Sequence, residues 1–128
     1  MATLKAIVWL GSSKKDLAGF PDEVEDDVGY NLFEAQEGKI PRDAKVLRGF
    51  GSASVLEIVS NFNTDTFRAV YTIEFAEAIY VLHCFQKKSK RGGETPKLDR
   101  DMIERRLSAA YGEHEQWQKL QSERMKKS

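Results

Sequence analysis

The sequence has 128 residues, which suits one domain and is short for two. Hydrophobic residues make up 41% and charged residues 31%, which is typical of a globular protein and excludes disordered or collagen-like classes. The longest apolar runs are far shorter than the roughly 20 residues of a membrane span, and the single cysteine, Cys84, excludes an internal disulfide. We therefore expect one cytoplasmic domain over residues 1–128 that does not contact a membrane.

Charge is balanced in total but segregated along the chain. The 20 basic and 20 acidic residues give a net charge of zero, which by itself argues against a nucleic-acid partner. Residues 20–37, however, contain seven acids and no lysine or arginine, whereas four of the five residues from Lys87 to Arg91 are basic. The simplest interpretation is a solvated acidic helix face followed by a basic loop.

The first half of the chain predicts one strand and one helix. Residues 4–10 are rich in β-forming side chains and end at a Gly-Ser-Ser turn, which predicts a strand. Residues 21–38 place apolar side chains at helical spacing behind Pro21 and a group of acids, which predicts a helix packed on the sheet. The basic connection that follows has turn signals at Gly49 and Gly51.

Three strands are predicted next, over residues 55–62, 67–75 and 78–86. Their connections are so short that neighbouring strands must be antiparallel. Continuing the pairing from Ile73 opposite Ile79 gives the pairs Tyr71–Val81, Ala69–His83 and Phe67–Phe85. We expect that face to be the core, and the opposite face, which carries Arg68, to be a mixed surface.

A long helix is predicted from Thr95-Pro96 onward, because apolar residues recur at helical spacing through Tyr111. Residues 121–128 have few apolar groups and are expected to fray. The element order β-α-β-β-β-α predicts an α+β fold, with a small antiparallel sheet and helices packed mainly on one face.

Several of these segments together resemble the phage-derived, RelE/HigB-like toxins of bacterial type II toxin–antitoxin systems. The resemblance covers roughly residues 45–107, and its most specific piece is a strand ending in His-x-Phe-x-Lys-Lys-Ser, followed by Thr-Pro and a helix. It implies a RelE-like fold and a toxin that cleaves translated messenger RNA on the ribosome. It also implies neutralisation by an antitoxin with a helix-turn-helix DNA-binding domain. Many relatives have Glu-Leu-Arg where this chain has Glu57-Ile58-Val59, so one arginine expected to face RNA is absent.

The candidate site residues follow from this resemblance and from the chemistry of RNA cleavage. Without a metal or cofactor, neither of which we expect here, lysine and arginine can assist proton transfer and stabilise the phosphorane charge. Arg68 is the candidate for a bidentate phosphate contact, and Lys87 and Lys88 are the other catalytic candidates. The resemblance points to both lysines, whereas strict alternation along the strand puts only Lys88 on the face of Arg68. The residues expected to contact the RNA backbone are Lys45, Arg48, Lys90 and Arg91.

Each candidate also has a structural interpretation. Arg68 on a surface strand could pair with Glu57 or Glu74 instead of phosphate, and the basic run could be a solvated loop. His83 falls on the expected apolar face and is interpreted as a hydrogen-bonded core residue rather than a general base.

Two further residues have no assigned chemistry. Cys84 is interpreted as a small buried hydrophobic residue, and His114 lies on an exposed-looking part of the last helix with no identifiable partner. The alternative function is a non-catalytic interaction protein, either a ParE-like gyrase poison or a phage remnant that only binds its antitoxin.

Overall fold

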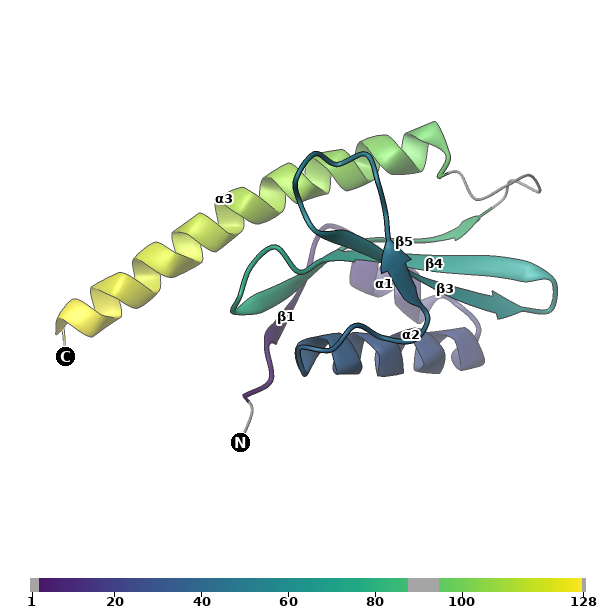
Figure 1. Ribbon diagram of the computed structural model, residues 1–128, viewed down its shortest axis with the longest axis horizontal. Coiled ribbons are helices and arrows are strands. Elements are labelled where there is room, and N and C mark those ends of the chain that lie inside the picture. The colour runs from purple at the N-terminus through teal and green to yellow at the C-terminus, as the bar shows by residue number, and fades with distance from the viewer. Residues whose placement is uncertain (1–2, 88–94, 128) are drawn as a thin grey trace.

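A five-stranded sheet with a helix against each face forms the fold (Figure 1). The structure is a computed structural model that describes residues 3–87 and 95–127. The elements in chain order are β1 (Ala6–Trp9), α1 (Ser13–Ala18), α2 (Asp22–Gln36), β2 (Ala44–Val46), β3 (Val55–Phe62), β4 (Asp65–Thr72), β5 (Ala78–Lys87) and α3 (Lys97–Lys127). The strand order is β1-β5-β4-β3-β2, in which β1 pairs parallel with β5 and the other pairs are antiparallel. The predicted α+β fold is confirmed, with a mixed sheet.

Helix α2 forms where the apolar spacing predicts it. Val24, Val28 and Leu32 recur every four residues and are buried against the sheet. The helix ends at Gln36, and Gly38, two residues further on, has a φ of +86°. There the N–H of Gly38 donates to the Ala35 carbonyl at 3.0 Å and that of Lys39 to the Glu34 carbonyl at 3.1 Å. This pattern is a Schellman motif, and it satisfies carbonyls that the last helical turn leaves unpaired.

Both faces of the sheet are cores, which corrects the expectation that the helices lie mainly on one face. On the α2 face, Ile58, Ala69, Tyr71 and Val81 pack with the apolar stripe of α2. On the opposite side, here called the α3 face, Val55, Val70, Tyr80 and Leu82 pack against Ile103, Leu107 and Ala110 of α3. The sequences of the central strands are almost continuously apolar because the sheet is covered by helices on both faces.

The pairing of β4 with β5 changes register at a β-bulge. Tyr71 pairs with Val81 as predicted, but Val70 pairs with His83, so Leu82 is an extra residue on β5. Beyond the bulge the predicted pairs are wrong by one residue: Ala69 lies opposite Cys84 and Arg68 opposite Phe85. Since side chains alternate along a strand, the extra residue moves His83 and Phe85 from the expected core face to the face of Arg68.

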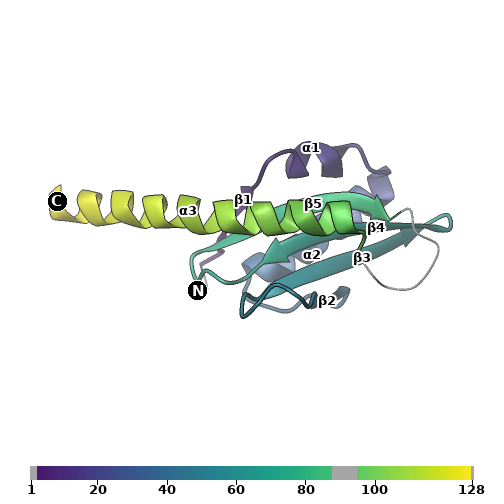
Figure 2. The same cartoon turned by 90° about the horizontal axis from the view of Figure 1, so that it is seen from above.

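Three further differences concern short or terminal elements. The turn after Gly11 continues into the short helix α1, and the basic connection contains the edge strand β2. Helix α3 continues through Lys127 and so includes residues 121–127 of the tail that we expected to fray. Its C-terminal half extends beyond the sheet, as Figures 1 and 2 show.

Candidate functional site

A buried ion-pair network lies on the α3 face, near the end of the sheet where β5 leaves it. Nη1 of Arg68 donates to Oε2 of Glu57 at 2.8 Å, and the two side chains are 5% and 2% exposed. Nζ of Lys45 lies 3.5 Å from Oε1 of the same glutamate, and the side chain of Lys45 is 59% exposed. We call Lys45, Glu57 and Arg68 the Glu57 network. Because the carboxylate fixes one edge of the guanidinium, Arg68 has a defined orientation.

Strand register determines which residues surround this network. Lys45 lies opposite Glu57, Val59 opposite Arg68, and Lys87 opposite Thr66. Thr66 and Arg68 share a face because they are two residues apart, so Lys87 lies on the face of Arg68. Alternation through an unbroken strand excluded Lys87 from that face. The bulge at Leu82 is the reason that Lys87 lies there, and Lys88 is outside the described residues.

Arg48, another predicted RNA-contacting residue, is not brought to the network. The N–H of Leu47 donates to the Val55 carbonyl at 2.8 Å, so the exposed Arg48 lies near the start of β3. Val59, opposite Arg68, is four residues further along the strand, a distance of about 13 Å. Lys88, Lys90 and Arg91 lie outside the described residues.

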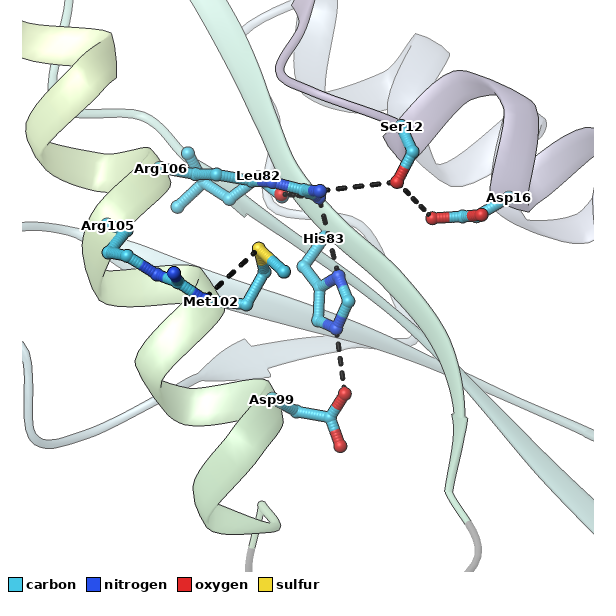
Figure 3. Close-up of polar contacts among 8 residues, drawn as sticks. All are labelled: Ser12, Asp16, Leu82, His83, Asp99, Met102, Arg105 and Arg106. Carbon is cyan, nitrogen blue, oxygen red and sulfur yellow. Dashed lines mark hydrogen bonds and ion pairs between the residues drawn. The ribbon is translucent and has the colours of Figure 1, made fainter.

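Arg106 of α3 holds the bulge in place (Figure 3). Its Nη1 donates to the carbonyl oxygen of Leu82, the bulged residue, at 2.9 Å, and its Nη2 donates to Oγ of Ser12 at 3.2 Å. A Cβ at Gly11, whose φ is +54°, would come within 2.8 Å of this guanidinium. The side chain of Arg106 therefore connects α3 to the bulge and packs closely against the backbone at Gly11.

His83 lies between the bulge and the first turns of α3. Its Nε2 is 2.8 Å from Oδ1 of Asp99, and its Nδ1 has a longer contact of 3.5 Å with Nη1 of Arg106. The ring also stacks on Phe85, with centroids 4.8 Å apart. Both ring nitrogens thus have protein partners, which fits the predicted structural role of this histidine, although it lies on the α3 face and not on the predicted one.

The structure also places His114, on helix α3. His114 is buried and does have partners: its Nε2 is 2.6 Å from Oε2 of Glu77 and its Nδ1 is 3.2 Å from the hydroxyl oxygen of Tyr80. Its ring lies between those of Phe75 and Trp117. This cluster ties the β4–β5 turn to the middle of α3, so the expectation of an exposed, unpartnered His114 is wrong.

A family model matches most of the chain. A model described as Phage derived protein Gp49-like (DUF891) matches residues 15–108, nearly three quarters of the chain. The chain belongs to the phage-derived Gp49-like family. The match runs from α1 through the first part of α3 and includes the Glu57 network, the bulge and Arg106. No curated protein matches the sequence.

Reasoning from sequence missed two polar residues that shape the site of this Gp49-like protein: Asp99 and Arg106. The pairing of Arg68 with Glu57, which is the structural interpretation of Arg68, is confirmed, but the pair is buried and not on the surface. Nothing in the local sequence identifies Asp99 or Arg106, because their partners are 16 and 23 or more residues away along the chain.

Among the described residues, no group of three or more histidine, cysteine, aspartate and glutamate side chains is arranged to hold a metal ion. Within the same residues, no helix is both long and apolar enough to cross a bilayer. Helix α3 has sufficient length, but it is rich in charged residues.

Two buried acidic groups on the α2 face predict a loss of stability at alkaline pH. Burial raises the pKa of Cys84 from 9.0 to about 12 and that of Tyr71 from 10.0 to about 12. The unfolded chain therefore releases these protons first, so the stability they contribute is present below pH 9 and is lost as the pH rises toward 12. For Cys84 the full loss is about 4 kcal/mol, at 1.36 kcal/mol per pH unit.

We expect the Cys84→Ala variant to have a flatter dependence of unfolding free energy on pH between pH 9 and 11 than the parent protein. Urea denaturation at a series of pH values measures this difference. Equal slopes for the two proteins would mean that the Cys84 thiol ionises in the folded state as it does in the unfolded chain.

Proposed function

We propose that this Gp49-like protein is the toxin of a type II toxin–antitoxin system and cleaves translated messenger RNA without a metal. In this proposal Arg68, Lys87 and Lys88 contact the scissile phosphate, and a helix-turn-helix antitoxin neutralises the protein. Family membership supports the toxin class. The observation that carries the catalytic part is that the bulge puts Lys87 on the face of Arg68 and Lys45.

The chemistry of RNA cleavage gives each group a role. The phosphorane that forms as the 2′-hydroxyl attacks carries additional negative charge, and a fixed guanidinium with a nearby ammonium would stabilise it. Glu57 holds Arg68 at 2.8 Å and so orients its planar fork before substrate arrives. Lys45, exposed at the outer side of the network, is the group that an approaching RNA strand would meet first.

The direct test is expression of the protein alone in a bacterial host, followed by mapping of the 5′ ends of cellular messenger RNA. We expect growth arrest and new 5′ ends within translated regions. Purified, metal-free protein should also cut messenger RNA on ribosomes with no metal added beyond the Mg²⁺ that the ribosomes themselves require. Growth without arrest at a high soluble level, or intact messenger RNA during arrest, would contradict the proposed ribonuclease.

The basic run after β5 gives a prediction about RNA affinity. If Lys88, Lys90 and Arg91 contact phosphates, as we propose, log K for single-stranded RNA should fall with log salt by about 0.7 per contact. Replacing all three residues by alanine should then reduce the slope by about 2. Fluorescence anisotropy at several salt concentrations measures both slopes, and parallel lines for the two proteins would remove these residues from the RNA interface.

A second candidate function is growth arrest by binding alone, without catalysis. The observation that favours it is the burial of Arg68, whose charge Glu57 already balances within the fold. Under this alternative, arrest would persist while messenger RNA stays intact, and substitution of Lys87 would leave the arrest unchanged. The 5′-end mapping described above therefore separates the two functions.

A further inference from the structure

Helix α2 presents an acidic surface that the fold does not require. Acids in its first turn stabilise the helix through its dipole, but Asp26 lies beyond that turn, and the helix contains no basic residue that could compensate its charge. Among the described residues, none of the carboxylates within Asp22–Gln36 forms an ion pair. This accumulation of uncompensated charge leaves α2 complementary to a cation-rich partner.

A groove runs along this helix, between α2 and the edge formed by β1 and α1. Its apolar floor includes Trp9, Leu17 and Leu32, and its α2 rim includes Glu25, Asp26 and Gly29. The groove follows the side of the sheet where β1 is the edge strand. Two hydrogen bonds between Lys5 and Gln36, both of 2.9 Å, hold β1 against the end of α2, so the groove walls are fixed to each other.

Gly29 on the groove rim has no structural reason to be glycine. It lies in the middle of α2, its backbone is helical, and a Cβ built on it would meet nothing within 4 Å. Glycine at such a position costs about 1 kcal/mol relative to alanine. A glycine that the fold does not need, on the rim of a groove, permits another chain to approach the helix backbone closely.

An exposed aromatic residue borders the same surface. Phe33 lies one helical turn beyond Gly29, and its exposed fraction is 42%. Large exposed aromatic side chains next to an apolar groove are typical of the anchoring positions of protein interfaces.

We propose that this groove binds a positively charged amphipathic segment of a partner protein. The apolar side of the segment packs on Trp9, Leu17 and Leu32, its lysine or arginine side chains pair with Glu25 and Asp26, and its backbone passes over Gly29. The negative rim repels RNA, so this surface is separate from the basic residues of the α3 face. Only the identification of this partner with the antitoxin rests on the proposed function; the docking surface itself does not.

The test uses the full chain and a synthetic probe, an amphipathic peptide of leucine and lysine of about 18 residues, which is five helical turns. A Trp117→Phe background leaves Trp9, on the groove floor, as the single tryptophan. We expect the peptide to shift Trp9 fluorescence to shorter wavelength. Two groove variants, Glu25→Lys/Asp26→Lys and Gly29→Gln, should each weaken binding about tenfold or more. Gly29→Gln should at the same time raise the melting temperature, because glutamine favours helix more than glycine does.

A matched control is available on the same helix. Glu23→Lys/Glu34→Lys makes the same change of net charge, but these residues lie roughly 150° around the helix from Glu25 and Gly29. The proposal requires that this control retain the parent affinity and that a leucine–glutamate peptide not bind.

Three results would each overturn the proposal. The first is no binding of the lysine peptide to the parent protein, and the second is equal weakening in the control and groove variants. The third is self-association of the parent protein that the groove variants abolish, which would identify the occupant as a second copy of the chain. None of these measurements involves RNA cleavage or growth arrest, so their failure is distinguishable from failure of the proposed ribonuclease.

Discussion

Replacing Arg68 by alanine is expected to lower the free energy of unfolding by about 3 kcal/mol, the lower end of the range for breaking a buried ion pair. The cause is the Glu57 carboxylate, which is 2% exposed and would lose its partner at 2.8 Å. Lys45 remains 3.5 Å from the same carboxylate, but it is largely exposed and compensates only in part. Urea denaturation monitored by circular dichroism measures the change. An Arg68→Ala variant would therefore mix loss of stability with any loss of activity.

Two further variants separate the buried charge from the lost contact. Glu57→Leu/Arg68→Leu removes both charges together and should remain within about 1 kcal/mol of the parent protein, because an apolar pair can replace a buried ion pair at little cost. Lys45→Ala should change stability by less than about 1 kcal/mol, since that partner is exposed. If Arg68→Ala were as stable as the parent protein, Arg68 and Glu57 would be solvated in solution.

Replacing Lys87 by methionine is expected to reduce messenger RNA cleavage about 100-fold or more, the typical effect of removing one group that stabilises transition-state charge. Methionine keeps an unbranched side chain at this buried position while removing the ammonium group. The rate of cleavage on ribosomes measures the effect, and the melting temperature of each variant establishes that the fold persists.

Gln86→Ala provides the matched control. Gln86 lies on the same strand, opposite Phe67 and therefore on the α2 face, and it is exposed. Its replacement should leave the cleavage rate within about twofold of the parent value, as for a surface substitution far from the chemistry. Equal rates for the methionine variant and the parent protein would remove Lys87 from the catalytic set and favour the non-catalytic alternative.

The sequence by itself predicted the elements that local patterns encode. The apolar stripe of α2, the close spacing of the three strands and the start of α3 each depend on residues within a few positions of one another, and all are present in the structure. The short turn at Asn63 and Thr64 also forced β3 and β4 to be antiparallel neighbours. The α+β class followed directly, whereas the short elements α1 and β2 were not predicted.

Only the tertiary structure decided which side chains share a face at the end of β5. One extra residue at Leu82 reverses the alternation of side chains beyond it. The β-propensity of the strand does not reveal this bulge, because Leu82 fits a strand as well as its neighbours do. The bulge is held by Arg106, which is 24 residues from Leu82 along the chain. Because that contact exists only once α3 packs on the sheet, alternation along the strand excluded Lys87 from the face of Arg68, where the folded protein places it.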